Sequence, residues 1–185
     1  ELRMNVQFTL VSPPTIVLTH KKQLRFLRHL NLAEKTGAME LEDFDLNTLP
    51  REIGGRWDEH PEYHNMVALS LRQNKIVEID QGVDKWVKLT ALDCSENRLG
   101  RLPMMIGVLL NLVDLKLSRN CLLELPKQLR RCQKLANLQV DHNDLREWPP
   151  CIESLTGLTE LSMSHNQIDD VPPTASTLNI LQILK

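Results

Sequence analysis

Four residues in the second half of the chain have side chains of the types that perform nucleophilic catalysis. Asp141 and His142 are adjacent, and Ser164 and His165 occupy the equivalent positions 23 residues later. In a hydrolase triad, histidine activates the serine hydroxyl and aspartate orients the histidine. The alternating apolar pattern around both pairs instead predicts neighbouring strands that face one surface, without a pocket or oxyanion donors. We interpret them as a pair of surface histidines, and the sequence predicts no catalytic residue and no enzyme.

The remaining histidines and the cysteines do not have the spacing of a metal site. His60 and His64 are four residues apart, but Pro61 between them opposes the helix that would bring both to one face. The four cysteines form no paired CxxC motifs and have no histidine at ligand spacing, which argues against zinc; they are Cys94, Cys121, Cys132 and Cys151. They are expected to be free thiols in a reducing compartment, which predicts a cytoplasmic protein. No metal or cofactor is predicted.

The composition narrows the class of protein further. The chain has 185 residues, of which 42% are hydrophobic, 25% charged and 4% aromatic, so a folded domain with an aliphatic core is expected. The net charge of −2 argues against a general nucleic-acid binder. No apolar run of about 18 residues occurs, so no membrane span is predicted. Residues 1–35 carry six basic and two acidic residues, and residues 36–65 carry two and eight, so these segments are expected to attract each other.

A motif repeated along the chain predicts the fold. The pattern LxxLxLxxNxL begins at Met66 and recurs at four later starts, each 23 residues apart: Leu89, Leu112, Leu135 and Leu158. A further start falls at Leu181. Five consecutive matches at one spacing are highly specific for leucine-rich repeats. The predicted fold is an α/β solenoid, a curved horseshoe with a parallel sheet on its concave face and helical or 3-10 turns on its convex face.

Each part of the motif has a physical role. The LxLxx segment alternates, which predicts a short strand with one buried face. An inward amide can satisfy turn backbone groups of its own and the adjacent coil, as we expect for Asn74, Asn97, Asn120, Asn143 and Asn166. Proline then starts the return path, where apolar residues three apart, such as Leu129, Cys132 and Leu135, face the sheet. Trp86 and Trp148 occupy leucine-type slots and are predicted to be core residues.

The first coil of the predicted solenoid, within residues 36–185, is irregular. Residues 36–46 match the motif poorly and place Phe44 in the asparagine slot. From there to the next start is 30 residues instead of 23, which predicts a loop insertion over residues 54–65.

The segments before the first coil do not follow the repeat. Residues 23–35 have leucines three apart among basic residues, which predicts an amphipathic helix that caps the first coil. Because Leu27, Leu30 and Leu32 also fit the motif, a further coil is the alternative. Residues 1–22 match no repeat and are expected to form an extended arm or a hairpin.

The 23-residue repeat with LPxxI resembles the intracellular leucine-rich repeats of the Ras-suppressor and Scribble-like group. The segment NLAEKTGAMELEDFDLNTLPREI, with the helix before it, resembles the amino-terminal cap of small cytoplasmic members. The resemblance covers about residues 24–185 and departs from the group at Phe44, in the insertion and over the first 22 residues. It implies a non-catalytic scaffold or adaptor in signalling.

Outward positions of the predicted strands define the candidate binding surface. The first column holds Glu40, Ser70, Asp93, Lys116, Gln139 and Ser162, the second holds Glu42, Arg72, Ser95, Ser118, Asp141 and Ser164, and the third holds Asp43, Gln73, Glu96, Arg119, His142 and His165. From these we predict twelve protein-binding residues: Glu40, Glu42, Asp43, Arg72, Gln73, Asp93, Glu96, Lys116, Arg119, Gln139, His142 and His165. Because hot spots favour arginine, Arg72 and Arg119 stand out. A solvated face that binds nothing is the alternative.

The leading functional prediction is a protein-interaction module that binds a protein through its concave face or edges. A structural subunit of a large assembly, held by its amino-terminal arm, is one alternative. The recognition domain of a longer enzyme, such as a GTPase, kinase, phosphatase or ubiquitin ligase, is another. Leu178, Leu181 and Leu184 open a coil without completing it, so the last full coil is expected to expose leucines and to be continued or covered by further protein.

Overall fold

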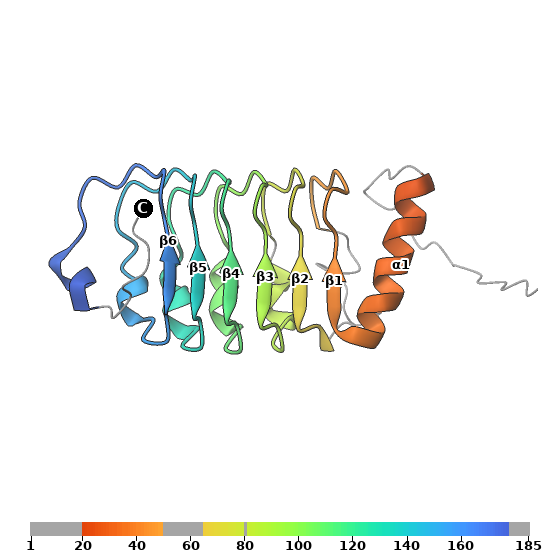
Figure 1. Cartoon of the computed structure of the whole chain (residues 1–185), viewed down its shortest axis with the longest axis horizontal. Coiled ribbons are helices and arrows are strands. Elements are labelled where there is room, and N and C mark those ends of the chain that lie inside the picture. The colour runs from red at the N-terminus through yellow and green to blue at the C-terminus, as the bar shows by residue number, and fades with distance from the viewer. Residues whose placement is uncertain (1–19, 50–64, 80, 178–185) are drawn as a thin grey trace, which may run out of the picture.

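Each leucine-rich segment forms a strand of three residues in the computed structural model, which describes residues 20–49, 65–79 and 81–177. The strands form one parallel, open sheet in chain order (Figure 1). They are β1 (Ala38–Glu40), β2 (Ala68–Ser70), β3 (Ala91–Asp93), β4 (Asp114–Lys116), β5 (Asn137–Gln139) and β6 (Glu160–Ser162). The predicted α/β leucine-rich repeat solenoid is therefore confirmed.

The register of the sheet follows the sequence period. From β2 onward each residue pairs with the residue 23 positions later, as in Ala68 with Ala91. Between β1 and β2 the offset is 30, as in Ala38 with Ala68, and the strands still align. The seven extra residues therefore do not disturb the ladder, because they enter the chain outside the strands. The predicted insertion at 54–65 lies outside the described residues except for Asn65.

The return paths contain short 3-10 helices on the side of the sheet opposite its exposed face (Figure 1). They are η3 (Gln81–Lys85), η4 (Met104–Val108), η5 (Lys127–Arg131), η6 (Ile152–Ser154) and η7 (Pro173–Thr177). Pro103 and Pro126 precede η4 and η5 in extended conformation with φ of −66°, which a pyrrolidine ring favours. Leu129, Cys132 and Leu135 are fully buried, so the predicted inward face of the return path is confirmed.

The core is a continuous aliphatic layer between the sheet and the 3-10 helices. Leu92, Leu115 and Leu138 pair across neighbouring strands and are at most 1% exposed. Trp86 and Trp148 are 1% and 8% exposed, which confirms that they are core residues. One coil cannot bury its own leucines, so each coil of the stack depends on its neighbours for burial.

The asparagines link neighbouring coils as predicted. Asn120 donates from Nδ2 to the Cys94 carbonyl of the preceding coil and to the Leu117 carbonyl of its own, both at 2.9 Å. Its Oδ1 accepts the Leu99 N–H at 2.9 Å. Asn74, Asn97, Asn143 and Asn166 make equivalent bonds to their own and the preceding coil. These bonds satisfy backbone groups where the chain leaves the strand, so the stack is held by polar as well as apolar contacts.

Helix α1 (His20–Thr36) lies against β1 at the amino-terminal end of the stack (Figure 1). It includes the range 23–35 for which the sequence predicts a capping helix. Ala33 is buried, and Phe26 and Leu30 pack against the core. Leu27, Leu30 and Leu32 all lie within the helix, so the alternative of a further coil is wrong. Gly37 then takes a φ of 71°, a conformation that glycine adopts without strain, and leads into β1.

Phe44 occupies an asparagine slot because its coil has a helix as its neighbour instead of another coil. In the later coils, the asparagine at this slot donates to carbonyls of the preceding coil. The first coil is preceded by α1, which presents side chains at that place instead of carbonyls. Phe44 is fully buried. The Phe26 ring meets it edge-on, with the two ring centroids 6.2 Å apart, and the Arg25 guanidinium carbon lies 4.6 Å from the centroid of the Phe44 ring. Aromatic packing against the helix therefore takes the place of the amide hydrogen bonds in this coil.

The predicted attraction between the basic first segment and the acidic second is confirmed within the described residues. Lys22 pairs with Asp45 at 2.8 Å, and Lys75 of the next coil pairs with the same carboxylate at 3.0 Å. Hydrogen bonds from these two lysines lower the pKa of Asp45 to about 2. These charges orient α1 on the first coil, although exposed pairs add little stability.

The carboxyl-terminal coil differs from the prediction. Leu161 and Met163 are only 4% and 7% exposed and Ile168 is half-buried, so the expectation that this layer is exposed is wrong. The chain continues past it into η7, whose Ala175 packs against the core. The incomplete coil predicted from Leu178 and the arm predicted over 1–22 lie outside the described residues, apart from residues 20–22 in α1.

Candidate functional site

The exposed face of the sheet carries a column of side chains that the sequence analysis missed. Because alternate residues of a strand face the same side, the first residue of each strand lies on this face with the third. These first residues are Ala38, Ala68, Ala91, Asp114, Asn137 and Glu160. The three alanines are adjacent in register and half-buried. Strand alternation, which predicts the column that begins at Glu40, also predicts this column, because Ala38 lies two residues before Glu40.

Residues of the predicted third column, like those of the second, lie beyond the end of each strand. They take a left-handed backbone conformation in the turn after each strand: Asp43, Gln73, Glu96, Arg119, His142 and His165 have φ between 52° and 58°. The column therefore forms a rim beside the sheet face instead of part of the strands. Non-glycine residues take this conformation at a cost, which the hydrogen-bonded turn of every coil offsets here. No glycine marks the position, so residue type alone does not reveal this conformation.

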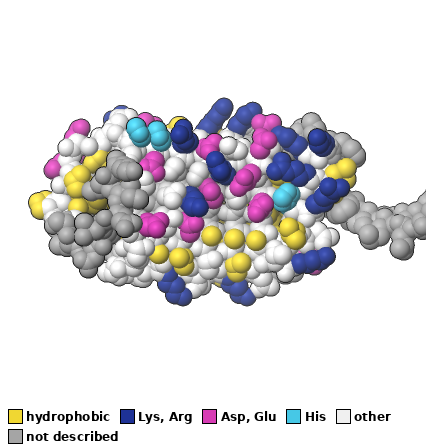
Figure 2. All heavy atoms as spheres, viewed as in Figure 1, with side chains coloured by type: hydrophobic (Ala, Val, Ile, Leu, Met, Phe, Trp, Pro, Cys, Tyr) yellow, Lys and Arg dark blue, Asp and Glu magenta, His cyan; other side chains and the backbone are white. Residues whose placement is uncertain are grey.

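The first three coils make one half of this surface acidic. Five of the predicted residues there are carboxylates, Glu40, Glu42, Asp43, Asp93 and Glu96, against one arginine, Arg72, for a net charge of −4. Figure 2 shows charged side chains of both signs across this face, with hydrophobic side chains along one side.

The Arg72 side chain is held in place by the next coil. Its Nε and Nη2 both donate to Glu96 Oε1, at 3.1 and 2.7 Å, and Gln73 donates to Glu96 Oε2 at 3.0 Å. The hydrogen bond from Arg72 lowers the pKa of Glu96, and the same bond raises the pKa of Arg72. Glu42 similarly accepts a hydrogen bond from Ser70 at 2.8 Å. The polar side chains therefore fix one another before any partner arrives.

The later coils carry the residues that resemble a catalytic triad. Asp141 accepts hydrogen bonds from the Ser118 and Ser162 hydroxyls and from the Ser164 backbone N–H. The imidazoles of His142 and His165 lie face to face, with ring centroids 4.1 Å apart and ring planes 11° apart. The two histidines are therefore neighbours, as predicted. They stack on each other, while Asp141 accepts hydrogen bonds from serines, so the side chains are not arranged as a catalytic triad.

The cysteines are free thiols, three of them buried and one exposed. Burial raises the pKa of Cys132 and of Cys151 to about 11 and raises that of Cys94 further. A thiol with a raised pKa remains protonated at neutral pH and reacts slowly, because the thiolate is the nucleophile. Cys121 is exposed.

We expect iodoacetamide at pH 7.5 to modify Cys121 alone in the folded protein and all four cysteines after denaturation. Intact-mass measurement distinguishes one adduct from four, and peptide mapping identifies the residue. A disulfide found in the denatured, unreduced sample would contradict the assignment of free thiols.

The described part of the chain offers neither a metal-binding cluster nor a membrane-spanning helix. No cluster of three or more histidine, cysteine or acidic side chains there is arranged to hold a metal ion. None of the helices in those ranges is long and apolar enough to cross a membrane.

Comparison with known proteins identifies the repeat and the fold. Residues 157–178 match the Leucine Rich Repeat family. A leucine-rich repeat protein of Leptospira interrogans is similar over 82% of this chain, with 27% identity and a TM-score of 0.67. The plant peptide hormone receptor RGFR1, solved in complex with RGF2, is similar over 79%, with 27% identity and a TM-score of 0.67. An internalin from Listeria monocytogenes is similar over 65%, with 23% identity and a TM-score of 0.59.

These structures are longer than the present chain, which spans 44%, 23% and 35% of the Leptospira protein, the plant receptor and the internalin, respectively. No curated protein matched in the sequence comparison. The repeat match, the structural likeness and the six-stranded open sheet agree on one conclusion: the chain folds as an α/β leucine-rich repeat solenoid with a parallel sheet.

Proposed function

We propose that the chain is a non-catalytic module that binds a protein through the exposed face of its sheet and the rim beside it. The carrying observation is that polar side chains of this face are already fixed by contacts between coils, such as Arg72 with Glu96 and Asp141 with Ser118. A surface ordered before binding loses less conformational entropy when a partner docks. Leucine-rich repeat folds generally serve protein–protein interaction, which favours the same function.

The proposed contact residues are the twelve predicted from the sequence, extended by the alanine column. Ala38, Ala68 and Ala91 provide a half-buried apolar row that allows close approach of a partner backbone. The carboxylates of the first three coils lie beside it and favour a partner with basic residues at that end. The plant receptor of similar fold was solved in complex with RGF2, which supports binding of a polypeptide.

The finer assignment follows from the form of the repeat. We propose that the chain belongs to the Ras-suppressor and Scribble-like group and acts as a cytoplasmic scaffold in signalling. The 23-residue spacing, the LPxxI tail and the four free thiols support this assignment.

A pull-down with matched variants tests the proposed binding face. We expect Arg72→Glu with Arg119→Glu to reduce recovery of a protein partner at least tenfold, because the first change breaks the contact with Glu96 that orders this face and the second reverses a charge on the rim. Arg130→Glu with Arg131→Glu, the same charge change in exposed residues of η5, should leave recovery unchanged. Circular dichroism should show both double variants folded, since surface substitutions shift stability by only about 0.5 kcal/mol.

The same pull-down distinguishes binding through the sheet face from the main alternative, a structural subunit of a large assembly. A partner that survives reversal of Arg72 and Arg119 but is lost when residues 1–19 are deleted would contradict binding through the sheet. It would favour a structural subunit held in an assembly by its amino-terminal arm.

A further inference from the structure

The outward side of α1 carries three exposed leucines. Leu24, Leu27 and Leu32 are 47%, 43% and 54% exposed, while the opposite side of the helix packs on the first coil through Phe26 and Leu30. Large apolar side chains gathered on one exposed face are typical of interaction sites. This surface belongs to the end of the stack and shares no residue with the sheet face.

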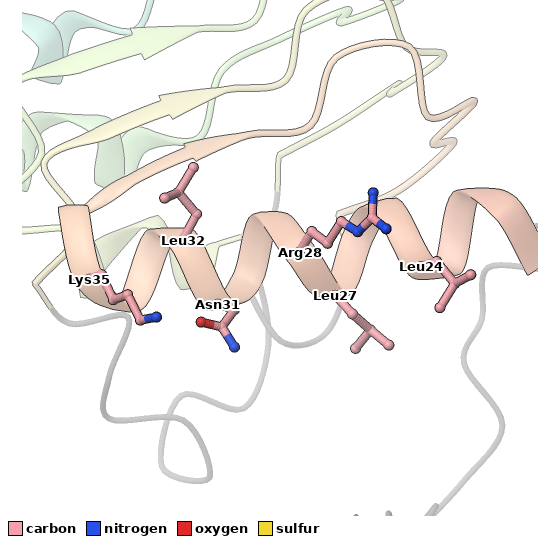
Figure 3. Close-up of a pocket in the computed structure, with 6 residues that line it drawn as sticks. All are labelled: Leu24, Leu27, Arg28, Asn31, Leu32 and Lys35. Atoms are coloured by element: carbon pink, nitrogen blue, oxygen red, sulfur yellow. The ribbon is translucent and has the colours of Figure 1, made fainter. Parts of the chain in front are cut away.

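A shallow hollow of about 460 Å³ lies along this side of α1. Its lining includes Leu24, Leu27, Arg28, Asn31, Leu32 and Lys35. Figure 3 shows Leu24 and Leu27 leaving the helix on one side and Leu32 and Arg28 on the other. The hollow therefore lies along the helix, with leucine and cationic side chains at its edges.

The charge of the same side points to the chemistry of that partner. Lys21, Arg28 and Lys35 are exposed and follow one another at intervals of seven residues, so they lie along one line of the helix. Between Lys21 and Lys35 the helix rises about 21 Å. Glu34 is the single carboxylate in the sequence of α1, and its position turns it away from this line. Three aligned cations alternate with exposed leucines.

We propose that this side of α1 binds an acidic amphipathic helix of another protein. A helix fits because its own ridges of side chains, spaced three and four residues apart, interlock with the leucine rows of α1. One apolar side chain of the partner fills the hollow, and carboxylates about one heptad apart pair with Lys21, Arg28 and Lys35. The leucines supply contact area and the cations set the orientation of the partner.

An anionic membrane would satisfy the cations but matches the shape less well. Helices that insert into a bilayer surface project their apolar residues outward from a convex face. Here the leucines border a depression, and the cations run through the middle of the apolar face instead of along its edges. These two features favour a protruding protein side chain over lipid.

The test uses the full chain and a fluorescein-labelled 22-residue helical peptide with leucine on one face and glutamate beside it. A control peptide carries glutamine in place of every glutamate. Fluorescence anisotropy should show the acidic peptide binding at least tenfold more tightly than the glutamine peptide. Arg28→Glu with Lys35→Glu should weaken binding tenfold or more, and a peptide with lysine in place of glutamate should bind this variant best. Arg130→Glu with Arg131→Glu serves as the matched control and should bind like the wild type.

The double variant Leu27→Ser with Leu32→Ser tests the hollow, because both leucines are exposed. It should bind the acidic peptide at least fivefold more weakly than the wild type does, with an unchanged circular dichroism spectrum. Equal binding of the two peptides, no binding of either, or no effect of the charge reversal would each overturn the proposal. Vesicles with 30% phosphatidylserine form the last arm, and binding of vesicles in preference to the acidic peptide would also overturn it. Because the variants with changed Arg72 and Arg119 are not used, failure here leaves the proposed sheet-face function standing.

Discussion

Replacement of Asn120 by alanine is expected to lower the free energy of unfolding by about 1–3 kcal/mol. The amide makes three hydrogen bonds, all at 2.9 Å, to the Cys94 carbonyl, the Leu117 carbonyl and the Leu99 N–H. Asn120 is only 8% exposed, so the Leu99 N–H loses its partner where water has little access. The two carbonyls each lose one bond and keep another, from Asn97 to the Cys94 carbonyl and from Asn143 to the Leu117 carbonyl. An unsatisfied buried polar group costs about 1–3 kcal/mol of stability. Loss of this buried hydrogen bond therefore costs more than loss of a hydrogen bond at the surface, where water can replace the missing partner.

Asn111→Ala provides the matched control for this prediction. Asn111 donates to the Val87 carbonyl and accepts from Lys134, but both bonds lie at the surface, where water replaces them. We expect a change within about 0.5 kcal/mol there. Urea unfolding followed by circular dichroism measures both variants, and equal stability of the two would show that the asparagine ladder does not hold the coils together.

The second large effect is expected at Gly107, in η4. A Cβ built on this glycine would lie 2.4 Å from the Gln128 carbonyl oxygen and 2.9 Å from the Gln128 carbonyl carbon of the next coil. The obstacle is backbone within η5, so relief requires the two coils to separate. We expect Gly107→Ala to cost about 3 kcal/mol or more, at the upper end of the range for overpacked sites.

Gly100 provides the control, because it shows that the expected loss of stability depends on the close contact at Gly107 and not on replacing a glycine as such. A Cβ on Gly100 meets nothing within 4 Å. We expect Gly100→Ala to leave stability unchanged or to raise it slightly, because alanine reduces the conformational freedom of the unfolded chain. Melting temperatures of the two alanine variants test the contrast, and a Gly107→Ala protein as stable as the wild type would refute the tight contact between η4 and η5.

Most of the repeating architecture was predictable from the sequence. The leucine period located each strand two residues after its motif start and fixed the register at 23 residues. The chemistry of an amide in a turn predicted the bonds of Asn120 to two coils, and slot equivalence predicted burial of Trp86. These features are repeated in every coil, so a local pattern read several times determines them.

The candidate site was predictable only in part. The columns at Glu40 and Glu42 follow from strand alternation, and the approach of His142 to His165 follows from the period. The left-handed turn at the third column was not predictable, because residues as different as Asp43, Arg119 and His142 adopt it. Hydrogen bonds between coils impose that conformation, and local propensity does not encode it.

The features decided by tertiary structure alone belong to particular positions and are not shared by every coil. Phe44 replaces an asparagine because α1 occupies the place of a preceding coil, and Gly107 is required because Gln128 of the next coil approaches it closely. The exposed leucines of α1 stay outside because one side of that helix suffices to cover the first coil. A repeated local pattern fixes what every coil shares, whereas unique contacts between neighbouring elements depend on packing in three dimensions, which no periodicity records.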